Sequence, residues 1–146
     1  RELFRPRWTA GDLVRFHTAH KMALPAHSPQ AYAELGRLVA RATSLDRAAL
    51  EAGYRELFMD ALAKMATARK HTNVLQHMAG YFKDLLDADE KQELLGGIED
   101  YRLGLVPLIV PLTLLKHHVR RHKVQYLAGQ VYLDPHPKEL MLRNHV

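Results

Sequence analysis

Cysteine is absent from this sequence of 146 residues, and serine occurs only at Ser28 and Ser44. Without cysteine, the chain has no disulfide framework, no thiolate nucleophile and no cysteine ligands for an iron–sulfur cluster. Both serines precede segments with helical periodicity, so we interpret them as helix caps rather than nucleophiles. A glycine-rich phosphate loop is also missing. The sequence therefore predicts no catalytic residue.

Long apolar runs are missing as well. The uncharged stretch Leu105–Leu115 is far shorter than the roughly 20 residues that a membrane-spanning helix needs. It also contains Pro107 and Pro111. No signal peptide is visible, and the chain starts at Arg1 rather than at a methionine. We expect a cytoplasmic domain without membrane association, excised from or partner to something longer.

Acidic residues are missing from two long segments. Residues 61–83 contain four Lys or Arg and no acid, and residues 101–133 contain five and no acid. The second segment includes the run Lys116–His122, in which six of seven side chains are cationic or can become so. The net charge of +5 understates this asymmetry, because the acids concentrate between residues 84 and 100. The pattern favours a polyanionic partner such as nucleic acid, and an ordinary solvated face is the alternative.

The periodicity of apolar residues predicts an all-α protein. We expect a single compact domain over residues 1–146, with about six to seven helices and one long central helix. Capping boxes and an N-terminal proline mark helix starts at Thr9, Ser28 and Asp87. The expected helices run over 9–24, 28–42, from Ser44 with an interruption at Gly53, 54–86, 87–103, from Pro107 or Pro111 through the basic run, 125–130 and 138–144.

Several polar positions on these helices carry residue types that bind RNA. Arginine and lysine pair with phosphates, whereas asparagine, glutamine and histidine hydrogen-bond base edges or 2′-hydroxyls. Arg69, Asn73 and the pair Gln76–His77 follow one face of the long helix, although a solvated face with a buried Asn–Gln network explains that spacing equally well. The candidate RNA contacts are Arg5, Arg7, Lys21, Arg69, Lys70, His71, Asn73, His77, Lys116, His117, His118, Arg120 and Arg121.

Ten histidines raise the question of a metal site. His17 and His20 are three residues apart and His118 and His122 are four apart, so each pair shares a helix face. No glutamate completes a zinc-protease motif, and cysteine ligands are absent. We therefore predict no metal site and interpret these histidines as polar or RNA-facing side chains.

Six segments, which span nearly the whole chain, match a known family: Phe4–Trp8, Phe16–Lys21, Ala26–Pro29, His71–Lys83, Pro107–Leu115 and Pro137–Asn144. They resemble the YbgA-type domain, a family named as a domain of unknown function. It occurs alone or C-terminal to a cysteine-rich desulfidase domain. The resemblance implies a helical, tRNA-binding partner of TudS/RudS-type thiouracil or 4-thiouridine desulfidases, which use a 4Fe–4S cluster. The cysteine-bearing half is not in this sequence, so the cluster is expected only in the partner domain.

Charge and resemblance together predict a non-catalytic domain that binds RNA. We expect it to present tRNA to a desulfidase domain, in cis or in trans, and to need no cofactor of its own. Two other functions stay open. One is a scaffold that docks an acidic partner or the desulfidase domain itself, and the other is a small enzyme with a histidine-built metal site.

Overall fold

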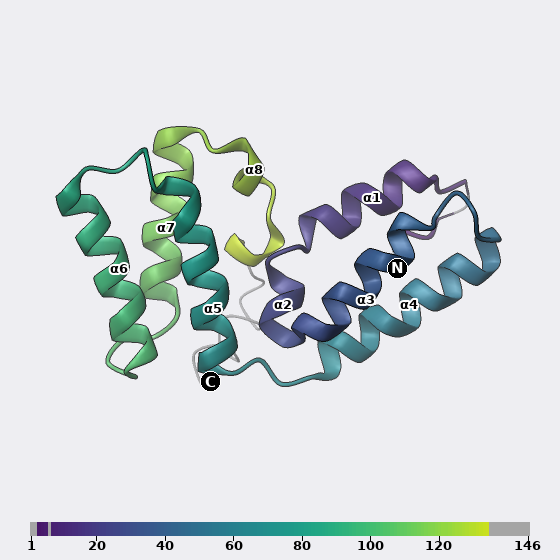
Figure 1. The fold of residues 1–146 in the computed structure, drawn as a ribbon, viewed down its shortest axis with the longest axis horizontal. Coiled ribbons are helices and arrows are strands. Elements are labelled where there is room, and N and C mark those ends of the chain that lie inside the picture. The colour runs from purple at the N-terminus through teal and green to yellow at the C-terminus, as the bar shows by residue number, and fades with distance from the viewer. Residues whose placement is uncertain (1–2, 6, 135–146) are drawn as a thin grey trace. The chain divides into compact units, whose positions relative to one another are not determined.

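The computed structural model describes residues 3–5 and 7–134, and this part of the chain is helical (Figure 1). The described residues contain eight α-helices, two short 3-10 helices and no strand, which confirms the all-α prediction. None of these helices combines the length and the apolar character needed to cross a lipid bilayer. The elements are α1 (Ala10–Ala19), α2 (Ala23–His27), α3 (Pro29–Ala40), α4 (Arg47–Ala63), α5 (Ala68–Ala79), η1 (Gly80–Phe82), α6 (Ala88–Arg102), α7 (Ile109–His122), α8 (Gln125–Ala128) and η2 (Val131–Leu133).

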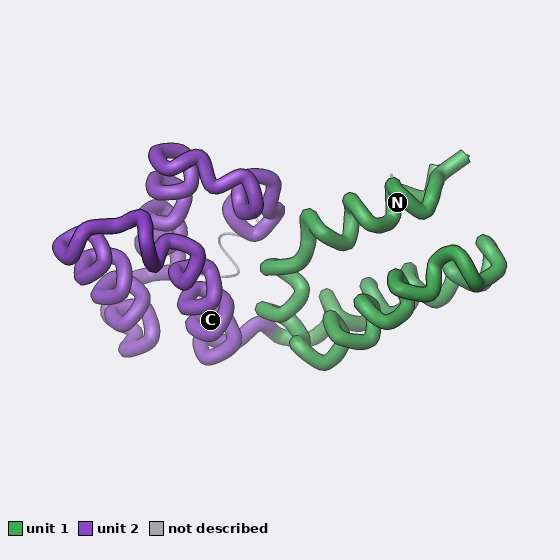
Figure 2. The backbone as a smooth tube through the Cα atoms, turned by 45° about the horizontal axis from the view of Figure 1, so that its top comes forward, with its two compact units in different colours: residues 1–65 green, residues 66–146 purple. Residues whose placement is uncertain are grey.

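The chain divides into two compact units (Figure 2). Unit 1 comprises Arg1–Met65 and holds α1 to α4, whereas unit 2 comprises Ala66–Val146 and holds α5 to α8. Each unit has its own buried apolar residues. The expectation of one domain over the whole chain stays a prediction.

Unit 1 is built around an aromatic core, and its helix starts follow the capping signals in the sequence. The predicted capping box of Thr9 and Asp12 opens α1, and Ser28 accepts a hydrogen bond from the Ala31 N–H at the start of α3. Trp8 is buried, and its indole Nε1–H donates to a carboxylate oxygen of Glu51 at 3.1 Å. The buried residues of this core are Trp8, Leu13, Leu24, Leu35, Leu50, Tyr54 and Ala61.

Unit 2 places α5, α6 and α7 side by side, with α5 and α7 running in the same direction and α6 in the opposite one (Figure 1). Ring contacts confirm these directions. His71, in the first turn of α5, lies 6.4 Å from Tyr101 near the end of α6. Phe82, just past the end of α5, lies 5.8 Å from His118 in the second half of α7. The end of α5, the start of α6 and the end of α7 therefore share one end of unit 2.

The predicted long helix over residues 54–86 is wrong. The backbone is extended at Lys64 and Thr67, and α5 starts anew with the Thr67 hydroxyl accepting from the Lys70 N–H. No proline or glycine lies between Tyr54 and Ala79 to mark this break, and the apolar spacing continues through it. The break falls at the boundary between the two units, so residues of one apparent stripe belong to two separate cores.

Smaller boundary predictions also need correction. The first expected helix is split into α1 and α2, and Asp46 rather than Ser44 caps α4. The Ser44 hydroxyl instead donates to the Arg41 carbonyl, and Gly53 lies inside α4 without interrupting it. Capping residues open α3 and α6 where expected. The helix expected over residues 138–144 lies outside the described residues.

His17 provides a test of the unit 1 core through its pH dependence. Burial first, and then the charges of His20 and Lys21, lower the pKa of His17 below its ordinary value of 6.5. The unfolded chain then binds this proton more tightly than the folded chain, so the free energy of unfolding falls as pH drops below about 6.5. We expect the thermal midpoint of wild type to fall more steeply between about pH 7.5 and 5 than that of His17→Gln. If the thermal midpoints of wild type and His17→Gln changed with pH in parallel, the burial of His17 would be contradicted.

Candidate functional site at the end of α7

Helix α7 positions the basic run because its other side is buried. Leu112, Leu115 and Val119 form a buried stripe along it. The helix ends at His122, and the residue that caps it, Lys123, has a φ of 53° and a ψ of 47°, which place a non-glycine residue in the left-handed region. This conformation costs about 1 kcal/mol, and glycine is the usual residue there. A cation therefore occupies a position where backbone preference alone favours glycine.

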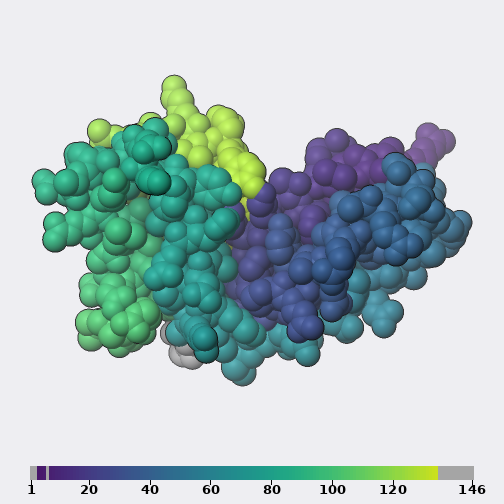
Figure 3. Space-filling model, viewed as in Figure 1, coloured from purple at the N-terminus to yellow at the C-terminus, as the bar shows by residue number. Residues whose placement is uncertain are grey.

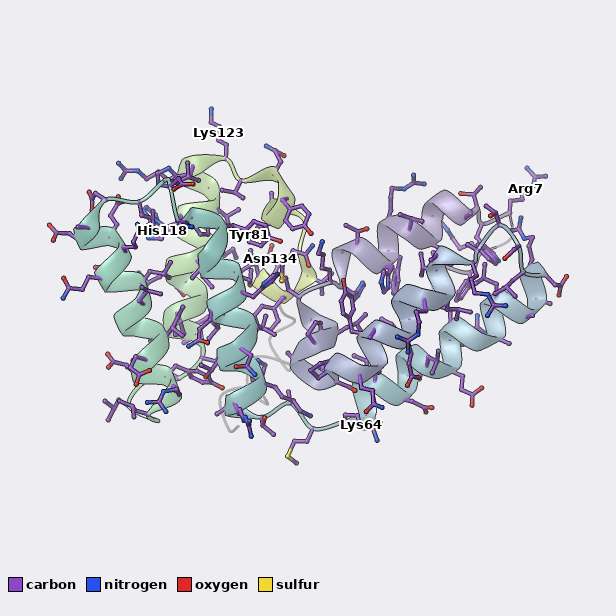
Figure 4. The ribbon with its side chains drawn as sticks, viewed as in Figure 1. Arg7, Lys64, Tyr81, His118, Lys123 and Asp134 are labelled. Carbon is purple, nitrogen blue, oxygen red and sulfur yellow. The ribbon has the colours of Figure 1, made fainter. Side chains whose placement is uncertain are left out.

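Arg120, Arg121 and Lys123 form what we call the basic end of α7. All three side chains are exposed, and none pairs with a carboxylate within the described part of the chain. Lys116 differs, because its Nζ lies 2.5 Å from Oδ1 of Asp134. Figure 4 shows Lys123 projecting from the tip of unit 2, and the space-filling view shows α7 and α8 on its upper rim (Figure 3).

A hollow of about 290 Å³ opens beside the basic end of α7. Its charged lining comes from Lys116, Arg120 and Lys123 on one side and Asp134 on the other. The i, i+4, i+7 spacing of the three cations puts them on one flank of the helix. Cations gathered around a hollow of this kind suit an anionic group such as a phosphate.

Two tyrosines missed by the sequence analysis lie close to this end of unit 2. The rings of Tyr81 and Tyr126 are 4.9 Å apart with an interplanar angle of 34°, and His77 meets Tyr81 edge-on at 5.6 Å. Tyr126 is 43% exposed and stands on α8, which packs against α7. The only sequence signal was its place three residues after Lys123. An exposed aromatic ring beside cations offers a stacking surface for a base.

Acidic side chains limit this surface on the α6 side. Because α6 starts where α7 ends, Asp87, Asp89, Glu90 and Glu93 lie at the same end of unit 2 as the basic run. Asp87 and Glu90 form the predicted capping box, which fixes the first turn of α6. The positive surface is therefore a strip bordered by acids rather than a broad patch.

The basic residues of segment 61–83 and those at the end of α7 do not form one surface within unit 2. Arg69 and Lys70 lie in the first turn of α5, at the opposite end of unit 2 from the basic end of α7. A helix of 12 residues is about 18 Å long, so one phosphate cannot bridge them. His77, near the end of α5, is on the same side as the basic end of α7. Asn73 and Gln76 are exposed, which excludes the buried Asn–Gln network.

Two of the candidate RNA contacts, His71 and His118, are buried side chains. His71 is fully buried, and its Nδ1 lies 2.7 Å from the Tyr132 hydroxyl. His118 is only 2% exposed, although its neighbour His117 is exposed. Their helix faces pack into the interior of unit 2, so neither imidazole can touch RNA on the surface. In unit 1, Arg5 and Arg7 are exposed and Lys21 is half-buried.

His118 and His122 lie next to a third titratable side chain, Glu90, that the sequence analysis missed. A side-chain oxygen of Glu90, on α6, and a ring nitrogen from each of His118 and His122, on α7, all lie within 4.8 Å of one another. Glu90 precedes His118 by 28 positions in the sequence, so sequence spacing alone gave no indication of this cluster. Two imidazoles and a carboxylate are groups that can bind a metal ion. The expectation of no metal site stays a prediction.

These features define an all-α protein with a basic helix end. The family described as "Protein of unknown function (DUF1722)" matches residues 21–137. The chain is also 36% identical over 139 residues to "Uncharacterized protein YbgA" of Escherichia coli (strain K12), covering 93% of this chain and 81% of that protein. The chain therefore belongs to the DUF1722 family, which confirms the resemblance to YbgA-type domains. No solved structure matches it.

The buried contact between His71 and Tyr132 predicts a measurable loss of stability. Tyr132→Phe removes the hydroxyl at 2.7 Å from His71 Nδ1 and leaves the rest of the ring in place. Losing a buried hydrogen bond of this kind costs about 1–3 kcal/mol. Chemical denaturation should show this decrease for Tyr132→Phe and a smaller one for Tyr126→Phe, whose side chain is 43% exposed. An equal effect of both changes would contradict the burial of this pair.

Proposed function

We propose that this chain binds RNA, and specifically tRNA, through the basic end of α7. The observation that carries the proposal is the exposed, uncompensated set of Arg120, Arg121 and Lys123 on a rigid helix end. We further propose that the chain is a non-catalytic partner that presents tRNA to a 4-thiouridine desulfidase domain carrying the 4Fe–4S cluster. The choice of tRNA and of this partner rests on the resemblance to fused YbgA-type proteins.

In this proposal phosphates supply the affinity and an aromatic ring supplies a local contact. Arg120 and Lys123 face the hollow beside α8, where a phosphate oxygen can accept hydrogen bonds from both. Arg121 extends the cationic strip on the adjoining face of α7. Tyr126 offers a ring on which an unpaired base can stack, a contact worth about 1–3 kcal/mol. The acids at the start of α6 repel phosphate and restrict the RNA path to one side.

Removing two charges from the basic end of α7 should weaken tRNA binding and its salt dependence together. Each neutralised phosphate contributes about 0.9 to the slope of log K against log salt for duplex and about 0.7 for single strands. For Arg120→Ala/Arg121→Ala we expect weaker binding and a slope that is flatter by about 1–2 units. Fluorescence anisotropy or gel shifts with tRNA across a salt series measure both quantities.

Arg69→Ala/Lys70→Ala is the matched control, because it removes the same charge from the opposite end of unit 2. We expect it to change the slope less than the α7 variant. Equal effects of the two double variants would show that binding follows net charge rather than this site. Unchanged affinity and slope in Arg120→Ala/Arg121→Ala would overturn the proposal. Thiolated and unthiolated tRNA, measured side by side, show whether this chain senses the sulfur.

A second candidate function, docking of a partner domain, is favoured by an apolar groove between α6 and α7. Its volume is about 650 Å³, and its floor forms where Gly97 lets α6 approach Leu114, since an added Cβ would lie 3.1 Å from that side chain. Exposed Ile109 and Val110 line it.

Val110→Glu should weaken binding of a desulfidase domain in trans about tenfold or more, whereas Leu85→Glu, outside the groove, should not. Calorimetry with the purified domain tests this, and equal binding by both variants would exclude the groove.

A further inference from the structure

We propose that Glu90, His118 and His122 form a binding site for a divalent transition-metal ion of the zinc class. The site lies inside unit 2, between the start of α6 and the last turns of α7, and Figure 4 shows His118 in that position. It is separate from the basic end of α7, whose cations point outward. It does not depend on RNA binding.

The ligand geometry comes from two helices. His118 and His122 are four residues apart on α7, so both rings extend from one face of the helix. Glu90 is supplied by α6, which runs antiparallel to α7. The three ligand atoms lie within 4.8 Å of one another. Ligands at about 2.1 Å from a shared zinc ion are at most about 4.2 Å apart, so small side-chain rotations complete the site.

The independent observation is a set of buried ring nitrogens without hydrogen-bond partners among the described residues. Both nitrogens of His118, which is only 2% exposed, and Nε2 of His122 are in this state. Leaving one buried polar group unsatisfied costs about 1–3 kcal/mol, so native proteins seldom contain such a cluster without a reason. A metal ion accepts the lone pair of a neutral imidazole nitrogen and removes that cost for each ligating nitrogen.

The surroundings orient the ligands. Oε1 of Glu90 accepts the Asp87 N–H at 3.1 Å in the capping box, which fixes the carboxylate and leaves Oε2 for a metal ion. Phe82 packs beside both imidazoles, with ring centroids 5.8 Å from His118 and 6.4 Å from His122. This aromatic wall excludes water from one side of the site.

Electrostatics also favour a cation here. The site lies near the carbonyl end of α7, where the helix dipole carries partial negative charge. Asp87 and Asp89, at the start of α6, add negative charge at the same end of unit 2. Three protein ligands leave a fourth position open for water or another donor. A bound ion would cross-link α6 to α7 and hold the basic end of α7 in place.

Metal titration of the full chain, purified without a histidine tag and stripped with chelator, tests the site. We expect elemental analysis to give one Zn²⁺ per chain and the thermal midpoint to rise with added Zn²⁺. Co²⁺ should give the visible absorption of a low-symmetry site with nitrogen and oxygen ligands. Glu90→Gln and His122→Gln should each lower Zn²⁺ affinity about 100-fold or more. Glu90→Gln keeps an oxygen acceptor for the Asp87 N–H, so the capping box survives.

His117→Gln is the matched control, since His117 is the exposed neighbour of His118 on the same helix. It should bind Zn²⁺ like wild type. Far-UV circular dichroism confirms that each variant keeps its helices. Absence of Zn²⁺ and Co²⁺ binding by wild type at up to about 100 μM ion would overturn the proposal, as would undiminished binding in Glu90→Gln and His122→Gln. Loss of binding in His117→Gln would assign the ion to another set of histidines and overturn it too.

Discussion

The packing of α7 against α5 and α6 is the constraint on which the rest of unit 2 depends. An α-helix turns by about 100° per residue, so burying Leu115 and Val119 decides where every neighbouring side chain points. His118 therefore points into the interior, and His122 lies on the same helix face one turn later. Arg120 and Arg121 are carried outward. A run that is continuous in sequence becomes two surfaces with different chemistry.

The direction of α6 then decides what each surface meets. Because α6 is antiparallel to α7, its acidic first turn lies at the same end of unit 2 as the basic run. The inner histidines gain Glu90 as a neighbour, and the outer cations are bordered by carboxylates. The proposed metal site and the proposed RNA surface are thus the two sides of one helix end. An ion on the inner side would stiffen the helix end that displays the outer cations, without contributing a contact to RNA.

Local signals in the sequence predicted helix starts well and the helix break poorly. Thr9, Ser28 and Asp87 act as caps because their side chains reach N–H groups only two or three residues away, which is a local interaction. The break before Thr67 has no such mark. Periodicity continued across it because residues on either side are buried in different units, and a periodic stripe does not reveal which core it enters. His71 and His118 were misplaced for a related reason, since a polar residue type says little about burial.

The sequence by itself determined the all-α class, the family, most helix starts and the presence of an uncompensated cationic run on α7. These depend on composition and on interactions within a few residues. Tertiary structure alone decided that Arg69 and Arg120 lie at opposite ends of unit 2, that Asp134 pairs with Lys116 and that Glu90 joins His118 and His122. The physical reason is that each of these facts depends on the relative direction and packing of separate helices, which no local pattern encodes.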